Sequence, residues 1–392
     1  MARRMPLLAV GCIGFLAVTA GAVGCSSSGS TASSGSSASS TSQSGQSANS
    51  SAVTAANAIL ATASNPPTTI AQTVPLPTTP PKGKTIVYLY DGTVSSQTYL
   101  ANEVKLAATA IGWNYDGITF EQSNPATLIA GLQTALVKHP TVVASAAQQY
   151  SMLGASIIAA YKKANVPLVF GGQATPLPAS PLLLGNPGGP DMYTLGGKDL
   201  AAWFVSDSKG AGKVLDVNIP ALTTLNPLFD SFDSEVKTLC PACQTKDVNM
   251  TISQATGGSQ ASVVVAELQR NPGYKYVFYS DGAFASGIAS ALASAGQSGV
   301  KVFGYDMQPE QAAALKSGTE AAWGGLNLNT YACELVDLAL RYVENAPSGE
   351  ANDDVMPTQV LTHANIGNQT SYNQPADVLQ QYEKIWKVPV TS

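Results

Sequence analysis

Two cysteines separated by two residues, Cys240 and Cys243, are the most direct candidates for thiol chemistry in the sequence. A redox-active C-x-x-C motif has its first cysteine at the N-terminus of a helix, where the thiolate is stabilised. Here the predicted helix ends near Leu239, before the first cysteine, which disfavours a redox role. In an exported chain, which the N-terminal sequence indicates, this spacing favours a local disulfide. We therefore predict a Cys240–Cys243 disulfide, with Cys333 as a buried free thiol on an apolar helix face.

The residues needed for several other chemistries are missing. The sequence beyond residue 82 contains no G-x-S-x-G, no G-x-x-x-x-G-K-S/T and no H-E-x-x-H pattern. Its two histidines, His139 and His363, are far apart, which disfavours a histidine-rich metal site. We therefore predict a protein that is not an enzyme and that requires no cofactor or metal. An exported enzyme on an α/β scaffold is a disfavoured alternative.

Residues 1–24 are predicted to be an export signal. Arg3 and Arg4 precede an apolar stretch at residues 6–19, which is too short for a stable membrane span. Small residues then lead to Cys25, and positions 22–25 resemble the lipobox of bacterial lipoproteins, with Ala22 where leucine is usual. The resemblance implies that Cys25 is diacylated, which would anchor the protein to the outer face of the cell membrane. An N-terminal anchor that is never cleaved is the alternative.

Residues 25–82 are predicted to be a disordered Ser/Pro-rich tether. Residues 26–81 carry no charge, and their Ser, Gly, Ala and Pro content cannot bury enough apolar surface to offset ordering. At most, residues 53–64 could form a weak helical turn. Residues 82–392 hold 18 of the 20 basic residues and all 25 acidic ones, a net charge of −7 without a basic run. We therefore do not expect the protein to bind nucleic acid.

From residue 84 the sequence alternates between short β-rich runs and helical segments. Strands are predicted at 85–90, 114–120, 141–145, 167–170, 214–218, 276–279 and 300–304. Helices are predicted at 97–111, 124–138, 152–164, 228–238, 260–269, 283–295 and 309–316. Such alternation is typical of parallel sheets with helices on both faces, and the Gly/Pro-rich residues 183–194 divide it into two halves. We predict an α/β fold of two Rossmann-like lobes around a cleft, where ligands bind beyond the carboxyl ends of the strands.

A set of short motifs keeps its order and spacing over nearly all of residues 84–340. The motifs are ANVPLV at 164–169, LGGK at 195–198, VFYSD at 277–281, SGIA at 286–289 and VFGYD at 302–306. Together they resemble the type 1 periplasmic binding proteins, specifically the ribose-receptor-like sugar receptors. The resemblance implies two lobes with parallel sheets, joined by a three-segment hinge, that close on a small solute and present it to the permease of an ABC importer.

The resemblance also implies how the chain is divided. It places the N-terminal lobe at residues 83–190 and 328–352, and the C-terminal lobe at residues 191–327 and 353–392. Residues 330–345 would form a helix that returns to the first lobe. We expect a monomer.

A ligand site follows from the same resemblance, at the strand ends that face the cleft. The implied ligand-binding residues are Tyr90, Asp91, Gln148, Gln149, Ser280, Asp281, Asp306 and Asn327. Carboxylates such as Asp306 can accept hydrogen bonds from ligand hydroxyls, and Tyr90 could stack on a sugar ring. The alternatives are a strand-end acid that caps the next helix, above all for Asp281, and ordinary solvated loop residues.

Three polar anchors of the sugar receptors are missing from this sequence. Gly171, Gly172 and Gln173 stand where those receptors place Asp-Arg, Leu228 stands where they place Arg, and Leu326 stands at their hinge glutamine. A pocket without these groups cannot pair many buried hydroxyls, so we expect a ligand with fewer hydroxyls than a free pentose.

The sequence thus predicts an extracytoplasmic, lipid-anchored receptor that delivers a sugar or sugar-like solute to an ABC importer. The alternative is a sensory lipoprotein that hands its ligand to a membrane kinase or chemoreceptor.

Overall fold

The computed structural model describes residues 40–348, 356 and 358–391. The predicted signal peptide and Cys25 lie outside these residues. Residues 44–392 form one compact unit, and the description below concerns this unit. Among the described residues, no helix is both long enough and apolar enough to cross a membrane.

The first lobe is built on a four-stranded parallel sheet in the order β2-β1-β3-β4. Its strands are β1 (Thr85–Asp91), β2 (Asn114–Phe120), β3 (Val142–Ala146) and β4 (Leu168–Gly171). Its helices are α2 (Ser95–Ala110), α3 (Pro125–Val137) and α4 (Gly154–Ala164). Alternate residues of β1 belong to different apolar clusters, Ile86 with Val104 of α2 and Val87 with Leu132 of α3. Because side chains alternate along a strand, helices cover both faces of the sheet, as predicted.

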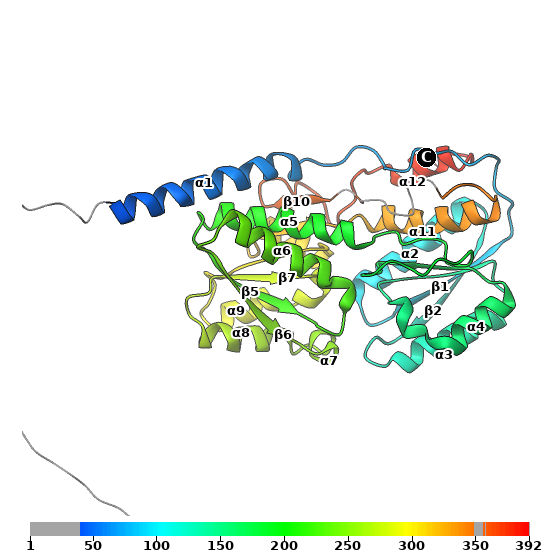
Figure 1. Cartoon of the computed structure of the whole chain (residues 1–392), viewed down its shortest axis with the longest axis horizontal. Helices are drawn as coiled ribbons and strands as arrows, with labels where there is room; N and C mark the ends of the chain where they lie inside the picture. The colour runs from blue at the N-terminus through cyan, green and yellow to red at the C-terminus, as the bar shows by residue number, and fades with distance from the viewer. Residues whose placement is uncertain (1–39, 349–355, 357, 392) are drawn as a thin grey trace, which may run out of the picture. The chain divides into compact units, whose positions relative to one another are not determined.

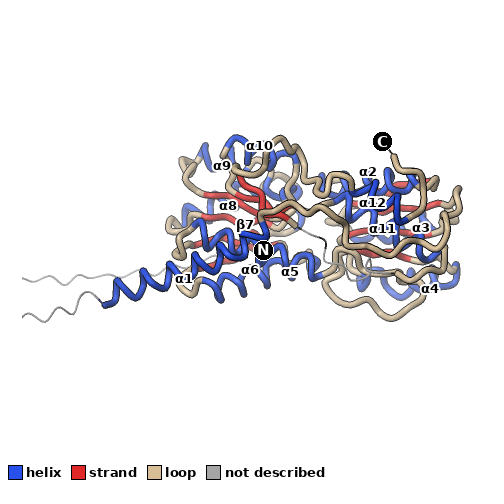
Figure 2. The backbone as a smooth tube through the Cα atoms, turned by 90° about the horizontal axis from the view of Figure 1, so that it is seen from above, coloured by secondary structure: helices blue, strands red, loops and turns tan. Residues whose placement is uncertain are grey.

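The second lobe is built on a six-stranded sheet in the order β10-β9-β8-β7-β5-β6. Its strands are β5 (Lys213–Asn218), β6 (Gln244–Asn249), β7 (Tyr276–Tyr279), β8 (Lys301–Gly304), β9 (Ala322–Gly325) and β10 (Gln359–Thr362), and only β10 is antiparallel to its neighbour. Its helices are α5 (Pro190–Asp207), α6 (Asn226–Leu239), α7 (Ile252–Thr256), α8 (Gln260–Arg270), α9 (Ile288–Ser294) and α10 (Pro309–Ser317). Figure 2 shows α5 and α6 along one side of this lobe, with α9 and α10 along the opposite side.

Close packing of α5 on α6 explains part of the LGGK motif. A Cβ atom on Gly197 would lie 2.1 Å from the Ser231 hydroxyl oxygen and 2.4 Å from the Leu228 carbonyl oxygen. Only glycine fits at this contact. Leu228 itself is fully buried between these helices, so the position where the sugar receptors carry an arginine is part of the core here.

The connections between the lobes differ from the predicted division. Helix α11 (Leu328–Val343) packs against α2 in the first lobe, and β10 then joins the second sheet. After β10 the chain returns, and α12 (Val378–Ile385) packs against α11 (Figure 2). The assignment of all of residues 353–392 to the C-terminal lobe is therefore wrong at its end. The physical reason is that α12 and the residue after it bury two large aromatic side chains, Tyr382 and Trp386, against the first lobe.

Helix α1 (Ser40–Ala63) occupies much of the stretch predicted as a tether. Ala52, Ala56 and Ala63 are buried along one side of it, and the Ser206 hydroxyl of α5 donates a 2.6 Å hydrogen bond to the side-chain oxygen of Asn57. A stripe of small residues lets α1 lie close to the second lobe.

Residues 64–81, here called the N-terminal strap, continue from α1 to the first lobe. Leu76 is fully buried, and its N–H donates a 2.8 Å hydrogen bond to the Ile385 carbonyl of α12. The Ile70 N–H donates to the Gln381 side chain of the same helix over 3.0 Å. The prediction of a disordered tether through residue 82 is therefore wrong for these residues. The physical reason is that isolated apolar side chains of the Pro-rich segment, such as Leu76, are buried where the strap packs against α12.

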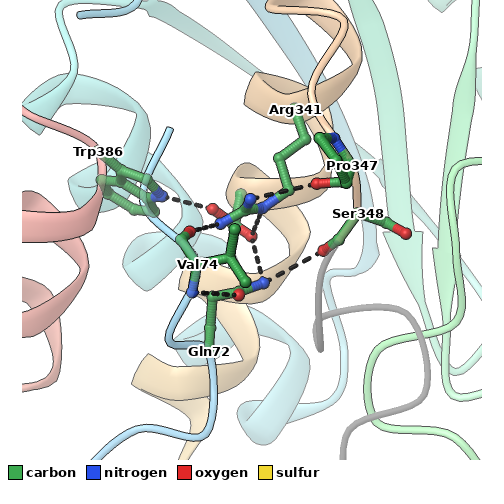
Figure 3. A network of polar contacts seen from close by, with 7 residues as sticks. Gln72, Val74, Arg341, Pro347, Ser348 and Trp386 are labelled. Atoms are coloured by element: carbon green, nitrogen blue, oxygen red, sulfur yellow. Dashed lines mark hydrogen bonds and ion pairs between the residues drawn. The ribbon is translucent and has the colours of Figure 1, made fainter. Parts of the chain in front are cut away.

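A buried ion pair anchors the strap (Figure 3). In α11 the Arg341 Nε donates to Asp337 over 2.6 Å, and both side chains are almost completely buried. Four further groups bond to the pair: the Val74 and Pro347 carbonyls accept from Arg341, while Gln72 and Trp386 donate to Asp337. Since a buried ion pair is favourable only when its remaining hydrogen bonds are made, the strap and α12 complete this site.

The structure joins Cys240 and Cys243 in a disulfide immediately after α6, and Cys333 of α11 is a buried free cysteine.

Candidate functional site

A small cavity lies between the lobes at the carboxyl ends of β7 and β8. Its volume is about 40 Å³. The first lobe lines it with Val94, Ser96, Gln97, Leu100, Gln122, Ala147, Leu328 and Tyr331, and the hinge and second lobe with Tyr193, Leu222, Thr224, Leu225, Asp281, Phe284, Asp306 and Leu326. A larger hollow of about 380 Å³ is formed by residues 176–191. That hollow contains none of the predicted site residues, so the cavity between the lobes is the candidate site.

Asp281 follows β7 and has two roles. Its Oδ1 accepts a 2.7 Å hydrogen bond from the Ala283 N–H, which caps the short 3-10 helix Gly282–Ala285. Its Oδ2 accepts a 2.9 Å hydrogen bond from the Ser96 hydroxyl of α2, which belongs to the opposite lobe. The capping alternative is therefore correct for one oxygen of Asp281, while the other oxygen bridges the cleft.

Asp306 follows β8, the strand next to β7. Its backbone has φ 54°, a left-handed conformation that residues other than glycine seldom adopt. Its Oδ1 accepts a 2.9 Å hydrogen bond from the Gln308 amide, and its carbonyl accepts from the Gly282 N–H over 3.1 Å. The turns after the two strands are thus tied together, with both carboxylates at the cavity.

The two carboxylates share an environment that disfavours charge. Burial raises the pKa of Asp281 to about 6. Burial, followed by the negative charge of Asp281, raises the pKa of Asp306 well above its usual value. Among the described residues, no lysine, arginine or histidine lines the cavity. The site therefore favours a ligand that brings hydrogen-bond donors, such as hydroxyl or amino groups.

Aromatic and aliphatic side chains form the rest of the wall. Tyr331 reaches in from α11, and its hydroxyl has no hydrogen-bond partner among the described residues. A Cβ atom on Gly171 would lie 2.6 Å from that hydroxyl oxygen. The glycines that replace the polar pair of the sugar receptors thus make room for Tyr331, and with Leu326 at the hinge the cavity has fewer polar anchors.

Two predicted residues at the end of β1 lie outside the cavity lining. Tyr90 stacks on Tyr88 with ring centroids 6.2 Å apart. The buried Asp91 accepts from the Thr93 N–H and hydroxyl and, over 2.7 Å, from the Gln122 N–H. Because Gln122 lines the cavity, Asp91 positions a lining residue.

The two glutamines after β3 connect loops. The Gln149 side chain donates to the Gly172 carbonyl and accepts from the Ala174 N–H, both over 3.3 Å. The Gln148 carbonyl accepts from the Gln173 amide over 2.6 Å. Neither glutamine lines the cavity, although their neighbour Ala147 does.

The remaining two predicted residues are also outside the lining. Ser280 is buried, and its hydroxyl has no hydrogen-bond partner among the described residues. The Asn327 side chain caps α11 by accepting from the Asn329 and Thr330 N–H groups, and it donates to the Gln374 carbonyl over 2.7 Å. Asn327 therefore fixes the hinge geometry.

Several lining residues were not predicted from the sequence, above all Ser96, Gln122, Tyr193 and Tyr331. Ser96 and Gln122 follow β1 and β2, so the rule that ligands bind beyond strand ends could have found them. Tyr193 and Tyr331 lie in helices that follow hinge segments, and no motif marked them.

Comparisons with known proteins agree with this architecture. Residues 86–347 match the family model described as periplasmic binding protein domain. No curated protein matches the chain.

Several solved structures share the fold. A 5-methylthioribose transporter solute binding protein from Thermotoga lettingae is 15% identical, with a TM-score of 0.65 over 80% of this chain and 99% of that one. An ABC transporter solute binding protein from Agrobacterium vitis with bound allitol is 20% identical, with a TM-score of 0.61 over 73% and 97%. The periplasmic binding protein component of the arabinose ABC transporter from Shewanella sp. ANA-3 is 14% identical, with a TM-score of 0.64 over 79% of this chain and 100% of that one. The predicted two-lobed α/β fold is confirmed.

Proposed function

The chain belongs to the periplasmic binding protein domain family, and we propose that it is an extracytoplasmic receptor that closes on a small, sugar-like solute and delivers it to an ABC importer. The observation that carries the proposal is the pair of buried carboxylates, Asp281 and Asp306, at adjacent strand ends facing the opposite lobe. Solved structures of the same fold support the solute class, since three of them contain bound allitol, L-arabinofuranose and 5-methylthioribose. The receptor is non-catalytic and acts as a monomer.

Solute entry requires the lobes to separate. Binding sites for small molecules usually enclose about 300–1,000 Å³, whereas this cavity encloses about 40 Å³. The Ser96–Asp281 hydrogen bond closes the cleft directly at the cavity. A solute hydroxyl that donates to Asp281 would take the place of the Ser96 hydroxyl, so the solute is captured by an opening and closing of the cleft.

The lining favours a solute with few hydroxyls and an apolar part. Asp281 and Asp306 accept hydrogen bonds, while Leu222, Leu225 and Leu326 offer only apolar surface. A free pentose or hexose would leave several hydroxyls unpaired against these leucines, at a cost of about 1–3 kcal/mol for each buried group. Deoxy sugars, alkylthio sugars and short polyols fit this lining better.

The membrane attachment rests on the sequence. Cys25, at the end of the lipobox-like residues 22–25, carries the lipid, and residues 1–24 are removed as the signal peptide. Cys25→Ser should leave the folded protein unprocessed or released from membranes. Lipid labelling of the Cys25→Ser variant at the level of the parent would contradict the anchor.

A thermal-shift screen over deoxy sugars, alkylthio sugars, polyols, pentoses and amino sugars tests the solute class. A solute at one hundred times its dissociation constant adds about 2.7 kcal/mol to the free energy of unfolding. Uptake of the radiolabelled hit by cells with and without the gene then tests delivery. Unchanged uptake together with a lost transcriptional or chemotactic response would favour the sensory alternative.

A further inference from the structure

Three aspartates form a cluster at the outer edge of the second lobe. Asp216 in β5 pairs in register with Asp247 in the edge strand β6, and Asp233 lies in the covering helix α6. One carboxylate oxygen from each residue lies within 4.8 Å of the other two. None of the three lines the cavity between the lobes.

The innermost member has no partner outside the cluster. Asp216 is 1% exposed, and among the described residues neither of its carboxylate oxygens accepts a hydrogen bond from outside the cluster. Asp233 is half-buried and Asp247 is exposed. No ion pair found among the described residues includes any of them. An unpaired buried carboxylate beside two others is costly unless something neutralises it.

The pattern of charge agrees with the geometry. Burial raises the pKa of Asp216 well above its usual value, followed by the charge of Asp233, a hydrogen bond with Asp233 and the charge of Asp247. Lys246 is next to Asp247 in β6, but successive strand residues point to opposite faces, and it bonds Glu267 instead. The cluster therefore brings together three carboxyl groups whose charge a cation from solution could neutralise.

We propose that Asp216, Asp233 and Asp247 bind a divalent cation, with Ca²⁺ as the expected ion. Oxygen donors alone select hard cations. Calcium–oxygen distances are about 2.3–2.6 Å, so two ligand oxygens on opposite sides of the ion lie about 5 Å apart. The separations in the cluster fit this limit. Ca²⁺ tolerates irregular geometry better than Mg²⁺, and the exposed Asp247 leaves room for water ligands.

The ion would link three elements that the local sequence already holds together. Helix α6 and strand β6 are joined by residues 240–243, which contain the Cys240–Cys243 disulfide. Asp233 and Asp247 lie on either side of this short connection. The cation would thus link strands β5 and β6 to helix α6, which would stabilise the second lobe independently of solute binding.

Thermal unfolding of the chelator-treated full chain tests the proposal. CaCl₂ at about one hundred times its dissociation constant should raise the melting temperature by about 5 to 10 °C, and NaCl of matched ionic strength should not. Asp247→Asn, at an exposed position, should weaken Ca²⁺ binding at least tenfold in calorimetry. Asp230→Asn, an exposed acid on the same helix and outside the cluster, should bind Ca²⁺ like the parent.

A proton shared by Asp216 and Asp233 is the competing way to neutralise the cluster. In that case Ca²⁺ would not change the melting temperature, and Asp216→Asn would raise it at pH 7 without added metal. That result, or an Asp247→Asn variant with the parent's calcium response, would overturn the proposal. A response to Mg²⁺ alone would overturn the assignment of calcium.

Discussion

The Ser96 hydroxyl in the first lobe donates a 2.9 Å hydrogen bond to the Asp281 carboxylate in the second lobe. Asp281 lines the cavity at the end of β7, and its other oxygen is held by the Ala283 N–H. The closed cleft thus satisfies a buried carboxylate with a hydroxyl from the protein itself. A solute hydroxyl that binds Asp281 has to replace this one.

Ser96→Ala should shift the ligand-free protein toward an open cleft. A hydrogen bond to a charged group contributes about 1.5–3 kcal/mol, so its loss should raise the solute association rate by about tenfold or more. Stopped-flow binding measures the rate, and small-angle scattering should show a larger radius of gyration without solute. Ser95→Ala, at the exposed neighbouring position, is the control. Equal association rates for the parent and Ser96→Ala would mean that this bond does not hold the cleft closed.

Asp306→Ala should weaken solute binding by about tenfold to a hundredfold, the worth of one charge-assisted hydrogen bond. The variant should stay folded, because the Asp306 side chain bonds only Gln308 among the described residues. Calorimetry with the solute found by screening measures the dissociation constant, and the exposed Asp230→Ala is the control. An unchanged dissociation constant would remove Asp306 from the site.

Solute affinity should fall as the pH drops through about 6. Burial raises the pKa of Asp281 to about 6 and also raises that of Asp306 well above its usual value, so protons compete with solute hydroxyls for these oxygens. The loss approaches tenfold per pH unit for each proton that must leave. Calorimetry between pH 5 and 7.5 should show this trend for a solute that does not titrate.

The stability of the ligand-free protein should show the opposite trend. Both carboxyls bind protons more tightly in the folded chain than in the unfolded chain, where the pKa is about 3.9. Their contribution to the free energy of unfolding therefore decreases as the pH rises from about 4 through the raised pKa values. An affinity that stays constant or improves toward pH 5 would contradict the affinity trend, and a free energy of unfolding that does not decrease as the pH rises through about 6 would contradict the stability trend.

The sequence predicted strands β1 to β5, β7 and β8 because their buried runs are rich in β-branched and aromatic residues, whereas β9 and β10 were not predicted. The edge strand β6 was missed because Val248 is its one buried residue, so the strand lacks a buried apolar run. The strap and α12 were missed for a different reason. The burial of their few apolar residues, such as Leu76 and Trp386, depends on the surfaces against which they pack in the fold.

The candidate site was predictable where strand topology decides it. Asp281 and Asp306 end neighbouring strands, and both line the cavity. Asp91 and Gln149 also follow strands, but their side chains bond to adjacent loops, and the backbone carbonyl of Gln148 does the same. Residue type and position could not distinguish a side chain that binds its own loops from one that faces the cleft.

The Cys240–Cys243 disulfide should be present in exported protein. Alkylation in denaturant without reductant, followed by mass spectrometry, should modify Cys333 alone among the three cysteines beyond residue 25. Replacing both partners with serine should lower the free energy of unfolding by about 2 kcal/mol on the chain-entropy model for so short a loop. Alkylation of all three cysteines would show that the pair is reduced.

Breaking the buried pair beneath the strap should destabilise the protein strongly. Arg341→Met leaves Asp337 charged and buried, which costs about 3–5 kcal/mol. Arg270→Met is the matched control, because Arg270 is 68% exposed in its pair with Glu267 and should change stability by less than about 1 kcal/mol. Adding Asp337→Asn to Arg341→Met should recover part of the loss, since the uncompensated charge is removed. Urea unfolding measures all three.

Gln72→Ala tests whether the strap itself contributes. Gln72 donates to Asp337 and to the Ser348 carbonyl, both over 3.2 Å, from a position more than 260 residues away in sequence. Removing its amide should lower the free energy of unfolding by about 1–2 kcal/mol, because Asp337 then loses one of its buried donors. Thr68→Ala, at an exposed position of the same strap, should have little effect. If Gln72→Ala unfolds at the same urea concentration as the parent, the strap is not docked in solution and residues 64–81 behave as the tether that their composition predicts.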